Sequence, residues 1–93
     1  MALHVVHWSF THDTAALDAV HPEHVTYLKD LLVQGKLVEA GPYEDQSGAI
    51  LIFRVDSTDD LTELLERDPY TKAGVIGATQ IYDWRPVLGP LSS

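Results

Sequence analysis

The chain has 93 residues, the size of one domain, and its formal net charge of −8 comes from 14 acidic and 6 basic residues. Phosphate backbones repel such a chain, so nucleic acid is excluded as an expected partner. No apolar run approaches the roughly 20 residues of a membrane span, and cysteine is absent. We therefore expect a single domain over residues 1–93, located in the cytoplasm, with no membrane partner, disulfide or thiolate metal site.

The first half of the chain predicts a strand, a helix and a second strand. Leu3 to Phe10 is rich in β-branched and aromatic residues, which favours a strand. Residues 13–20 are expected to be a connector, because Pro22 suits the first position of a helix. That helix is expected over residues 22–34, with Gly35 at its C-terminal end. Residues 36–40 predict the second strand, which the turn residues Gly41-Pro42 should close.

The second half predicts a strand, a helix and a last strand. Residues 49–55 form the most apolar run of the chain. Ser57 or Thr58 is expected to cap a helix whose first turns are acidic, which the helix dipole favours. Pro69 should stop that helix, and residues 75–84 predict the last strand. The order β-α-β-β-α-β indicates a ferredoxin-like α+β fold: a four-stranded antiparallel sheet with strands one and three central and both helices on one face.

Both faces of the expected sheet carry apolar side chains. In the third strand, Leu51 and Phe53 share one face, whereas Ile50 and Ile52 share the other. In the last strand, the apolar residues that are expected to share one face are Ile76, Ala78, Tyr82 and Trp84. Two helices can cover only one face of the sheet. We therefore expect a homodimer in which a second copy covers the other face.

Two short motifs that contain proline, around His24 and Asp68, carry residue types that could form a proton-transfer site. His24 lies near the start of the expected first helix, and imidazole exchanges protons near neutral pH. Asp68 precedes Pro69, which is a good capping sequence for a short helix. A fold that joins these helix ends would form an acid/base pair in which the carboxylate orients the imidazole. One carboxylate oxygen could cap while the other orients His24, although a surface histidine and a simple cap are the plain alternatives.

Histidine spacing gives little support for a metal site. His21 and His24 are three apart, but His21 is expected to lie outside the helix. His4 and His7 are three apart on a strand and should face opposite sides of the sheet. No third ligand lies at a useful spacing. We expect no metal and no cofactor.

The chain resembles the YCII-related family of small proteins, which have a ferredoxin-like, dimeric α+β-barrel fold. The residues that carry the resemblance are Pro22-x-His24, Gly35-Lys36-Leu37, Ala40-Gly41-Pro42 and Asp68-Pro69-Tyr70-x-x-Ala73-Gly74-Val75. Many family members have an arginine where this chain has His21. The resemblance implies an active-site pair formed by His24 and Asp68.

Together the motifs and the resemblance favour cofactor-independent acid/base catalysis, an elimination or isomerisation of a small cyclic or aromatic compound. His24 and Asp68 are the expected catalytic residues. The expected substrate-binding residues are His21, Tyr27, Gly41, Pro42 and Tyr70. A non-catalytic module that binds a small molecule or serves as an accessory subunit is the alternative. A monooxygenase of the related dimeric-barrel type is a third hypothesis.

Overall fold

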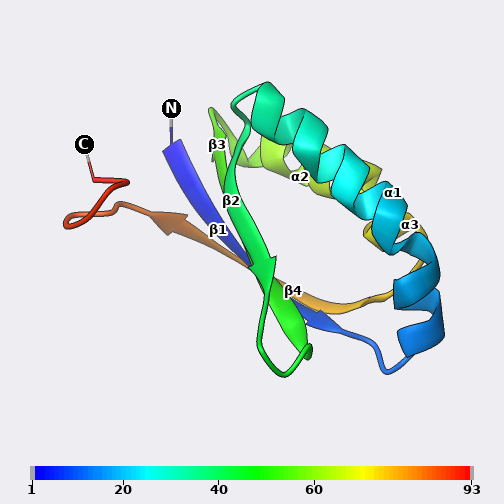
Figure 1. The fold of residues 1–93 in the computed structure, drawn as a ribbon. Coiled ribbons are helices and arrows are strands. Elements are labelled where there is room, and N and C mark those ends of the chain that lie inside the picture. Colours follow the sequence, from blue (N-terminus) through cyan, green and yellow to red (C-terminus); the bar gives the residue numbers. More distant parts are fainter. Residues whose placement is uncertain (1, 93) are drawn as a thin grey trace.

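A computed structural model of the chain describes residues 2–92 and contains one antiparallel sheet with helices on one face (Figure 1). The strands are arranged in the order β2-β3-β1-β4. The ferredoxin-like prediction, with strands one and three central, is confirmed. In chain order the elements are β1 (Ala2–Phe10), α1 (Thr14–Val33), β2 (Leu37–Pro42), β3 (Gly48–Val55), α2 (Thr58–Arg67), α3 (Pro69–Lys72) and β4 (Ile76–Trp84).

The core lies between the sheet and the helices. Strands β1 and β3 pair so that Val6 lies opposite Leu51 and Trp8 lies opposite Ala49, and all four side chains are buried. This confirms the predicted alternation in β3, because Leu51 and Phe53 face the helices while Ile50 and Ile52 do not. The strand face that meets the helices therefore supplies most of the apolar area removed from water.

Helix α1 begins eight residues earlier than predicted, so the expectations of a connector at 13–20 and of His21 outside the helix are wrong. The Asp13 side chain caps the helix by accepting a hydrogen bond of 3.0 Å from the backbone N–H of Ala16. Pro22 lies inside the helix on an exposed position, where it removes one backbone hydrogen bond. The turns before Pro22 persist because Leu17 and Val20 pack against the core.

Strand β2 continues through Gly41 and Pro42, which were expected to close it. Gly41 pairs with Ile50 and Pro42 with Ala49. Proline is tolerated there because β2 is an edge strand and Pro42 is its last residue. The hairpin to β3 is then closed by the backbone N–H of Tyr43, which donates a hydrogen bond of 3.0 Å to the carbonyl of Gly48.

The sheet face away from the helices is open and partly apolar. Val5 lies there between Ile52 and Tyr82, and Tyr82 is 54% exposed. A register shift between Ser9 and Phe10 moves Ile76 to the helix side, where it packs against the core. The expectation that Ile76 shares the face of Tyr82 is therefore wrong, because the bulge breaks the two-residue alternation.

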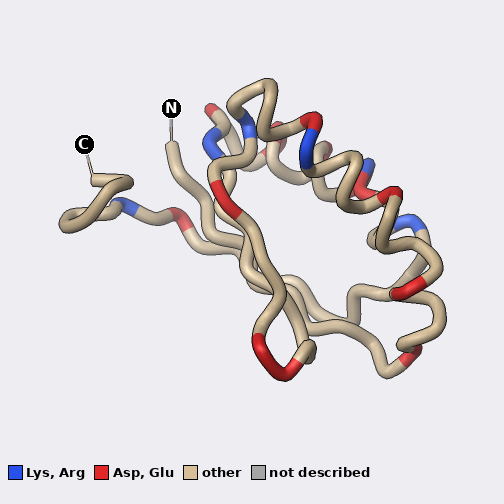
Figure 2. Tube along the Cα trace, in the orientation of Figure 1, with Lys and Arg blue, Asp and Glu red and all other residues tan. Residues whose placement is uncertain are grey.

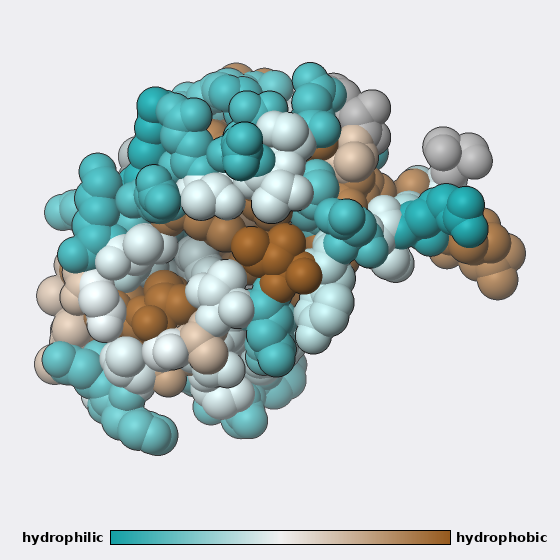
Figure 3. Space-filling model, turned by 180° about the vertical axis from the view of Figure 1, so that it is seen from behind, coloured by the Kyte–Doolittle hydropathy of each residue, from teal (hydrophilic) through white to brown (hydrophobic). Residues whose placement is uncertain are grey.

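The positively charged residues of the described chain are scattered over the surface and form no continuous basic stripe. Acidic residues follow the helices and the β2–β3 turn, and the cations are scattered among them (Figure 2). Seen from behind, apolar side chains gather on the projecting C-terminal tail (Figure 3), where Val87 and Leu88 are 72% and 91% exposed. Among residues 2–92, no helix is long and apolar enough to cross a membrane.

Candidate active site

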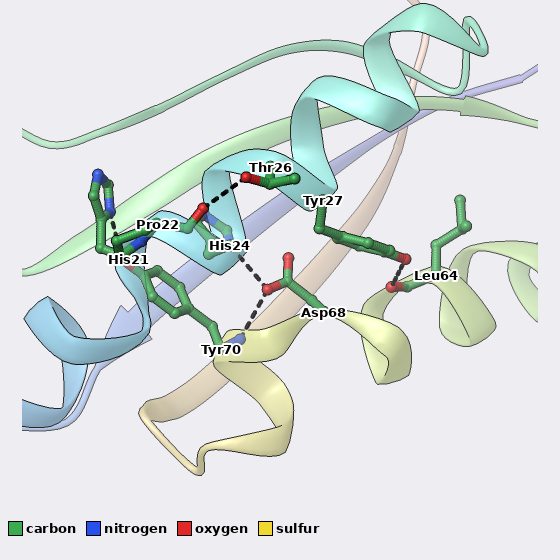
Figure 4. A network of polar contacts seen from close by, with 8 residues as sticks. All are labelled: His21, Pro22, His24, Thr26, Tyr27, Leu64, Asp68 and Tyr70. Atoms are coloured by element: carbon green, nitrogen blue, oxygen red, sulfur yellow. Dashed lines mark hydrogen bonds and ion pairs between the residues drawn. The ribbon is translucent and has the colours of Figure 1, made fainter.

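The side chains of His24 and Asp68 meet between α1 and the junction of α2 and α3 (Figure 4). His24 Nδ1 lies 2.8 Å from Asp68 Oδ1, and the two residues are 7% and 1% exposed. The expected approach of the two side chains is therefore present, but His24 comes from the middle of α1 and not from its start, whereas Asp68 lies at the junction of α2 and α3. A buried carboxylate and imidazole in contact form a hydrogen-bonded acid/base pair.

Asp68 is held by two donors at a single oxygen. The residue leaves helical geometry with φ −66° and ψ 132°, which lets its side chain turn back as the N-cap of α3. Its Oδ1 accepts 2.9 Å from the backbone N–H of Tyr70 and also accepts from His24 Nδ1. Capping and imidazole contact thus share Oδ1, where one oxygen for each had been expected. Two donors offset part of the cost of burying a carboxylate and fix its position.

The His24 ring lies between two aromatic side chains. Its centroid is 3.8 Å from that of Tyr70, with planes inclined by 7°, and 5.8 Å from that of Trp8, inclined by 46°. These contacts fix the plane of the imidazole. Because Nδ1 faces the Asp68 carboxylate and donates to it, the neutral ring carries its basic lone pair on Nε2. His24 is therefore oriented as a base at Nε2.

Tyr70 connects this pair to His21. The Tyr70 hydroxyl oxygen lies 2.9 Å from His21 Nδ1, and its ring meets Phe10 edge to face. Burial, followed by the negative charges of Asp68 and Asp18, raises the pKa of the Tyr70 hydroxyl above its ordinary value. The hydroxyl therefore keeps its proton at neutral pH and can donate it in a hydrogen bond to His21 Nδ1. His21 itself is exposed.

The remaining expected substrate-binding residues occupy other positions. Tyr27 lies beside Asp68 in Figure 4, but its hydroxyl donates 2.6 Å to the carbonyl of Leu64 and so joins α1 to α2. Burial raises the pKa of Tyr27, and Asp68 adds to the effect. Gly41 and Pro42 lie in the edge strand β2, where they pair with Ile50 and Ala49 of β3.

Sequence reasoning missed a second histidine–carboxylate pair. His4 Nδ1 lies 2.9 Å from Asp83 Oδ1, across the β1–β4 ladder. His4 and His7 do face opposite sides, since His7 contacts the Tyr43 hydroxyl instead. No spacing rule could find a pair that is 79 residues apart. In the part of the chain that the structure describes, no three histidine, aspartate or glutamate side chains form a metal-binding group.

Two cavities of about 1030 and 250 Å³ lie away from the His24–Asp68 pair, and neither is lined by either residue. His24, at 7% exposed, is the member of the pair that reaches the surface, whereas Asp68 is almost completely buried.

Comparison with known proteins places this chain in a family. The sequence matches the family model of the YCII-related domain over residues 2–85. The chain belongs to the YCII-related family. A search of curated proteins finds no match to this YCII-related chain.

Solved structures share the fold of this YCII-related protein. One is the 5-chloro-2-hydroxyhydroquinone dehydrochlorinase of Burkholderia phenoliruptrix, in complex with 2,5-dihydroxybenzoquinone; its TM-score is 0.78 at 26% identity, over 89% of this chain and 93% of that chain. A protein of Agrobacterium tumefaciens has a TM-score of 0.59 at 18% identity, over 99% and 97% of the two chains. A NIPSNAP family protein of the same organism has a TM-score of 0.59 at 17% identity, over 98% and 95%. The last two likenesses concern the fold alone.

Proposed function

We propose that this protein is an enzyme that performs cofactor-independent elimination on a small hydroxylated aromatic or cyclic compound. The observation that carries the proposal is the buried contact of 2.8 Å between His24 Nδ1 and Asp68 Oδ1. In this role His24 takes a proton at Nε2, and Asp68 stabilises the imidazolium that results. Isomerisation would use the same proton transfer without a leaving group.

Exposure decides which member of the pair can meet a substrate. His24 is 7% exposed, and Asp68 is 1% exposed and already accepts two hydrogen bonds. A substrate proton can therefore reach the imidazole but not the carboxylate. Asp68 acts through His24 by holding its ring and tautomer, as the carboxylate does in other histidine-based sites.

Similarity to the dehydrochlorinase supports the substrate class and the reaction type. That protein is named for the removal of hydrogen chloride from a chlorinated hydroxyhydroquinone, and it shares 26% identity with this chain over most of both. In such an elimination, a base removes a proton from the substrate, and the electron pair of the broken bond forms a new double bond. Chloride leaves with its bonding electrons as that double bond forms, so the carbon that carried it keeps four bonds. His24 Nε2 is the base that this chain offers.

His21 and Tyr70 are proposed to bind the substrate beside that base. His21 is exposed, and its Nδ1 is occupied by the Tyr70 hydroxyl at 2.9 Å. The other ring nitrogen, Nε2, is therefore the one that can meet a ligand. An imidazole held in this way suits a phenolic hydroxyl or oxygen anion. Tyr70 also supports His24 by stacking, so one residue joins both histidines.

A homodimer is proposed as the working form. The open sheet face exposes Tyr82 and Trp84, at 54% and 40%, and Ile50 at 39%. An apolar face of this kind is a liability for a monomer. A second copy that packs sheet against sheet would cover it by the same residues on both sides.

The direct test measures chloride release from 5-chloro-2-hydroxyhydroquinone under anaerobic conditions. We expect turnover by the native protein, loss of at least a hundredfold with His24→Gln, as for removal of a general base, and a smaller loss with Asp68→Asn, which can still cap α3. His12→Gln changes an exposed histidine outside the site and should leave the rate unchanged.

Other outcomes would contradict the proposal. Full activity of His24→Gln would show that His24 is not the general base of the reaction. Saturable binding of the substrate or of 2,5-dihydroxybenzoquinone without chloride release or isomerisation would favour the non-catalytic binding module.

A further inference from the structure

The last turn of α2 ends in a way that releases Asp68 from the helix. In a regular α-helix, the backbone N–H of Asp68 would donate to the carbonyl of Leu64, four residues earlier. Here it donates to the carbonyl of Leu65 instead, at 3.3 Å. Pro69 explains the change, because proline has no N–H to give to that carbonyl. The carbonyl of Leu64 therefore loses the donor that a continuing helix would supply.

Tyr27 supplies the missing donor. Its hydroxyl donates a hydrogen bond of 2.6 Å to the carbonyl oxygen of Leu64 (Figure 4). Leu64 is 8% exposed, and a buried carbonyl without a donor is costly to the fold. Burial, followed by the charge of Asp68, raises the pKa of the Tyr27 hydroxyl, so the hydroxyl keeps its proton and remains a donor at neutral pH.

One side of α1 makes both contacts with the end of α2. His24 and Tyr27 are three residues apart on α1 and are therefore neighbours on its surface. His24 Nδ1 lies 2.8 Å from Asp68 Oδ1, and the Tyr27 hydroxyl lies 2.6 Å from the Leu64 carbonyl oxygen. Tyr27 thus fastens the last turn of α2 to the helix that carries the imidazole.

The Tyr27 hydroxyl also removes a competitor for Asp68. Without it, the helical donor for the Leu64 carbonyl is again the backbone N–H of Asp68. To reach that carbonyl, the peptide group before Asp68 must turn, and the turn moves the Asp68 side chain with it. The carboxylate would then leave the position in which its Oδ1 accepts from Tyr70 and His24. The Tyr27 hydroxyl therefore favours the conformation in which the carboxylate meets the imidazole.

We propose that Tyr27 is a positioning residue for the His24–Asp68 pair. Its hydroxyl satisfies the Leu64 carbonyl and so leaves Asp68 free to orient the imidazole. Tyr27 acts through Asp68 and does not touch the substrate, whereas substrate binding was expected from the sequence. The effect on catalysis rests on the proposed function of the pair, but the effect on the imidazole does not.

The first test follows the imidazole and needs no substrate. Long-range ¹H–¹⁵N NMR spectra of the full-length ¹⁵N-labelled protein distinguish the two neutral tautomers of a histidine ring. In the native protein we expect His24 to be protonated at Nδ1. Tyr27→Phe should give a mixture of both tautomers. It should also speed hydrogen exchange of the Tyr70 amide at least tenfold, as for loss of a hydrogen bond to a charged group.

Kinetics test the same role in the proposed reaction. Tyr27→Phe should lower kcat for chloride release about tenfold and change KM less than about twofold, because the hydroxyl does not contact the substrate. Added to Asp68→Ala, which removes the carboxylate, the same substitution should cause no further loss, since Tyr27 then has nothing to position.

Thr26→Val is the matched control on α1. It removes an exposed hydroxyl that donates to the carbonyl of Pro22 at 3.0 Å, one residue before Tyr27. Because that hydroxyl does not reach α2, its loss should change neither the His24 tautomer nor kcat.

Three results would overturn the assignment. A native tautomer of His24 in Tyr27→Phe would show that the hydroxyl does not hold Asp68 in place. Additive losses in the double variant would show that Tyr27 acts by a route other than Asp68. A raised KM at unchanged kcat would make Tyr27 a substrate-binding residue. If the native protein releases no chloride, the proposed function is wrong, and the tautomer of His24 still decides the role of Tyr27.

Discussion

The Tyr70 ring lies parallel to the His24 imidazole, with centroids 3.8 Å apart and planes inclined by 7°. The same residue donates its backbone N–H to Asp68 and bonds His21 through its hydroxyl. Tyr70 therefore supports the orientation of three site residues at once. Its position after Asp68-Pro69 is what allows this, since the one-turn helix α3 brings its ring back over α1.

Substitution of Tyr70 should separate these roles. Tyr70→Phe keeps the ring and the backbone donor but loses the hydroxyl contact with His21, so we expect a few-fold decrease in kcat/KM and a stability loss of about 1 kcal/mol. Tyr70→Leu also loses the stacked ring, and we expect a decrease of at least tenfold. The measurements are chloride release and denaturant unfolding. Equal rates for the two variants would show that stacking does not orient His24.

Stability should fall in strongly alkaline solution because of two tyrosines. Burial raises the pKa of Tyr70 and of Tyr27 in the folded protein above the ordinary value of 10.0. Between the unfolded and folded pKa values, the unfolded chain releases the phenolic proton first, so the free energy of unfolding decreases as pH rises. This contribution is fully present below pH 10.0 and is lost above it.

Urea unfolding at several pH values between about 9 and 11 measures this slope. Tyr70→Phe and Tyr27→Phe should each make it shallower, because phenylalanine has no proton to release. A slope that is the same in both variants and in the native protein would contradict the prediction.

The open sheet face should mediate dimerisation. Light scattering at micromolar concentration is expected to give about twice the chain mass of 10.3 kDa. Tyr82→Glu places a charge in that face and should yield the monomer. Val33→Glu is the matched control, since Val33 is 87% exposed on α1, and it should remain dimeric. A monomeric native protein would show that the second copy is not what covers this face.

Gly48 is required by close backbone approach. A Cβ at this position would lie 1.9 Å from the carbonyl oxygen of Trp8, whereas one at Gly41 would meet nothing within 4 Å. Gly48→Ala must push β3 from β1 and should destabilise the protein by about 1–3 kcal/mol. Gly41→Ala should change stability far less. Thermal unfolding of both variants measures the difference, and similar melting temperatures would contradict the predicted clash.

The sequence by itself determined those features that depend on neighbouring residues. Alternation over residues 49–55 predicted the buried side of β3, and Ser57 and Asp68 were both foreseen as caps. Gly35 was expected to end the first helix and adopts the positive φ of 77° that glycine tolerates there. These features depend on local geometry and local hydrogen bonds, so a short segment of the sequence is enough to predict them.

Tertiary structure decided what depends on contacts between distant segments. Packing of Leu17 and Val20 kept the helix intact across Pro22, although proline favours a helix start. A bulge placed Ile76 on the helix side of the sheet. The stacking of Tyr70 on His24 and the pairing of His4 with Asp83 arise only when separate elements pack together. The sequence supplies these side chains, but which of them come into contact depends on the free energy of packing over the whole chain.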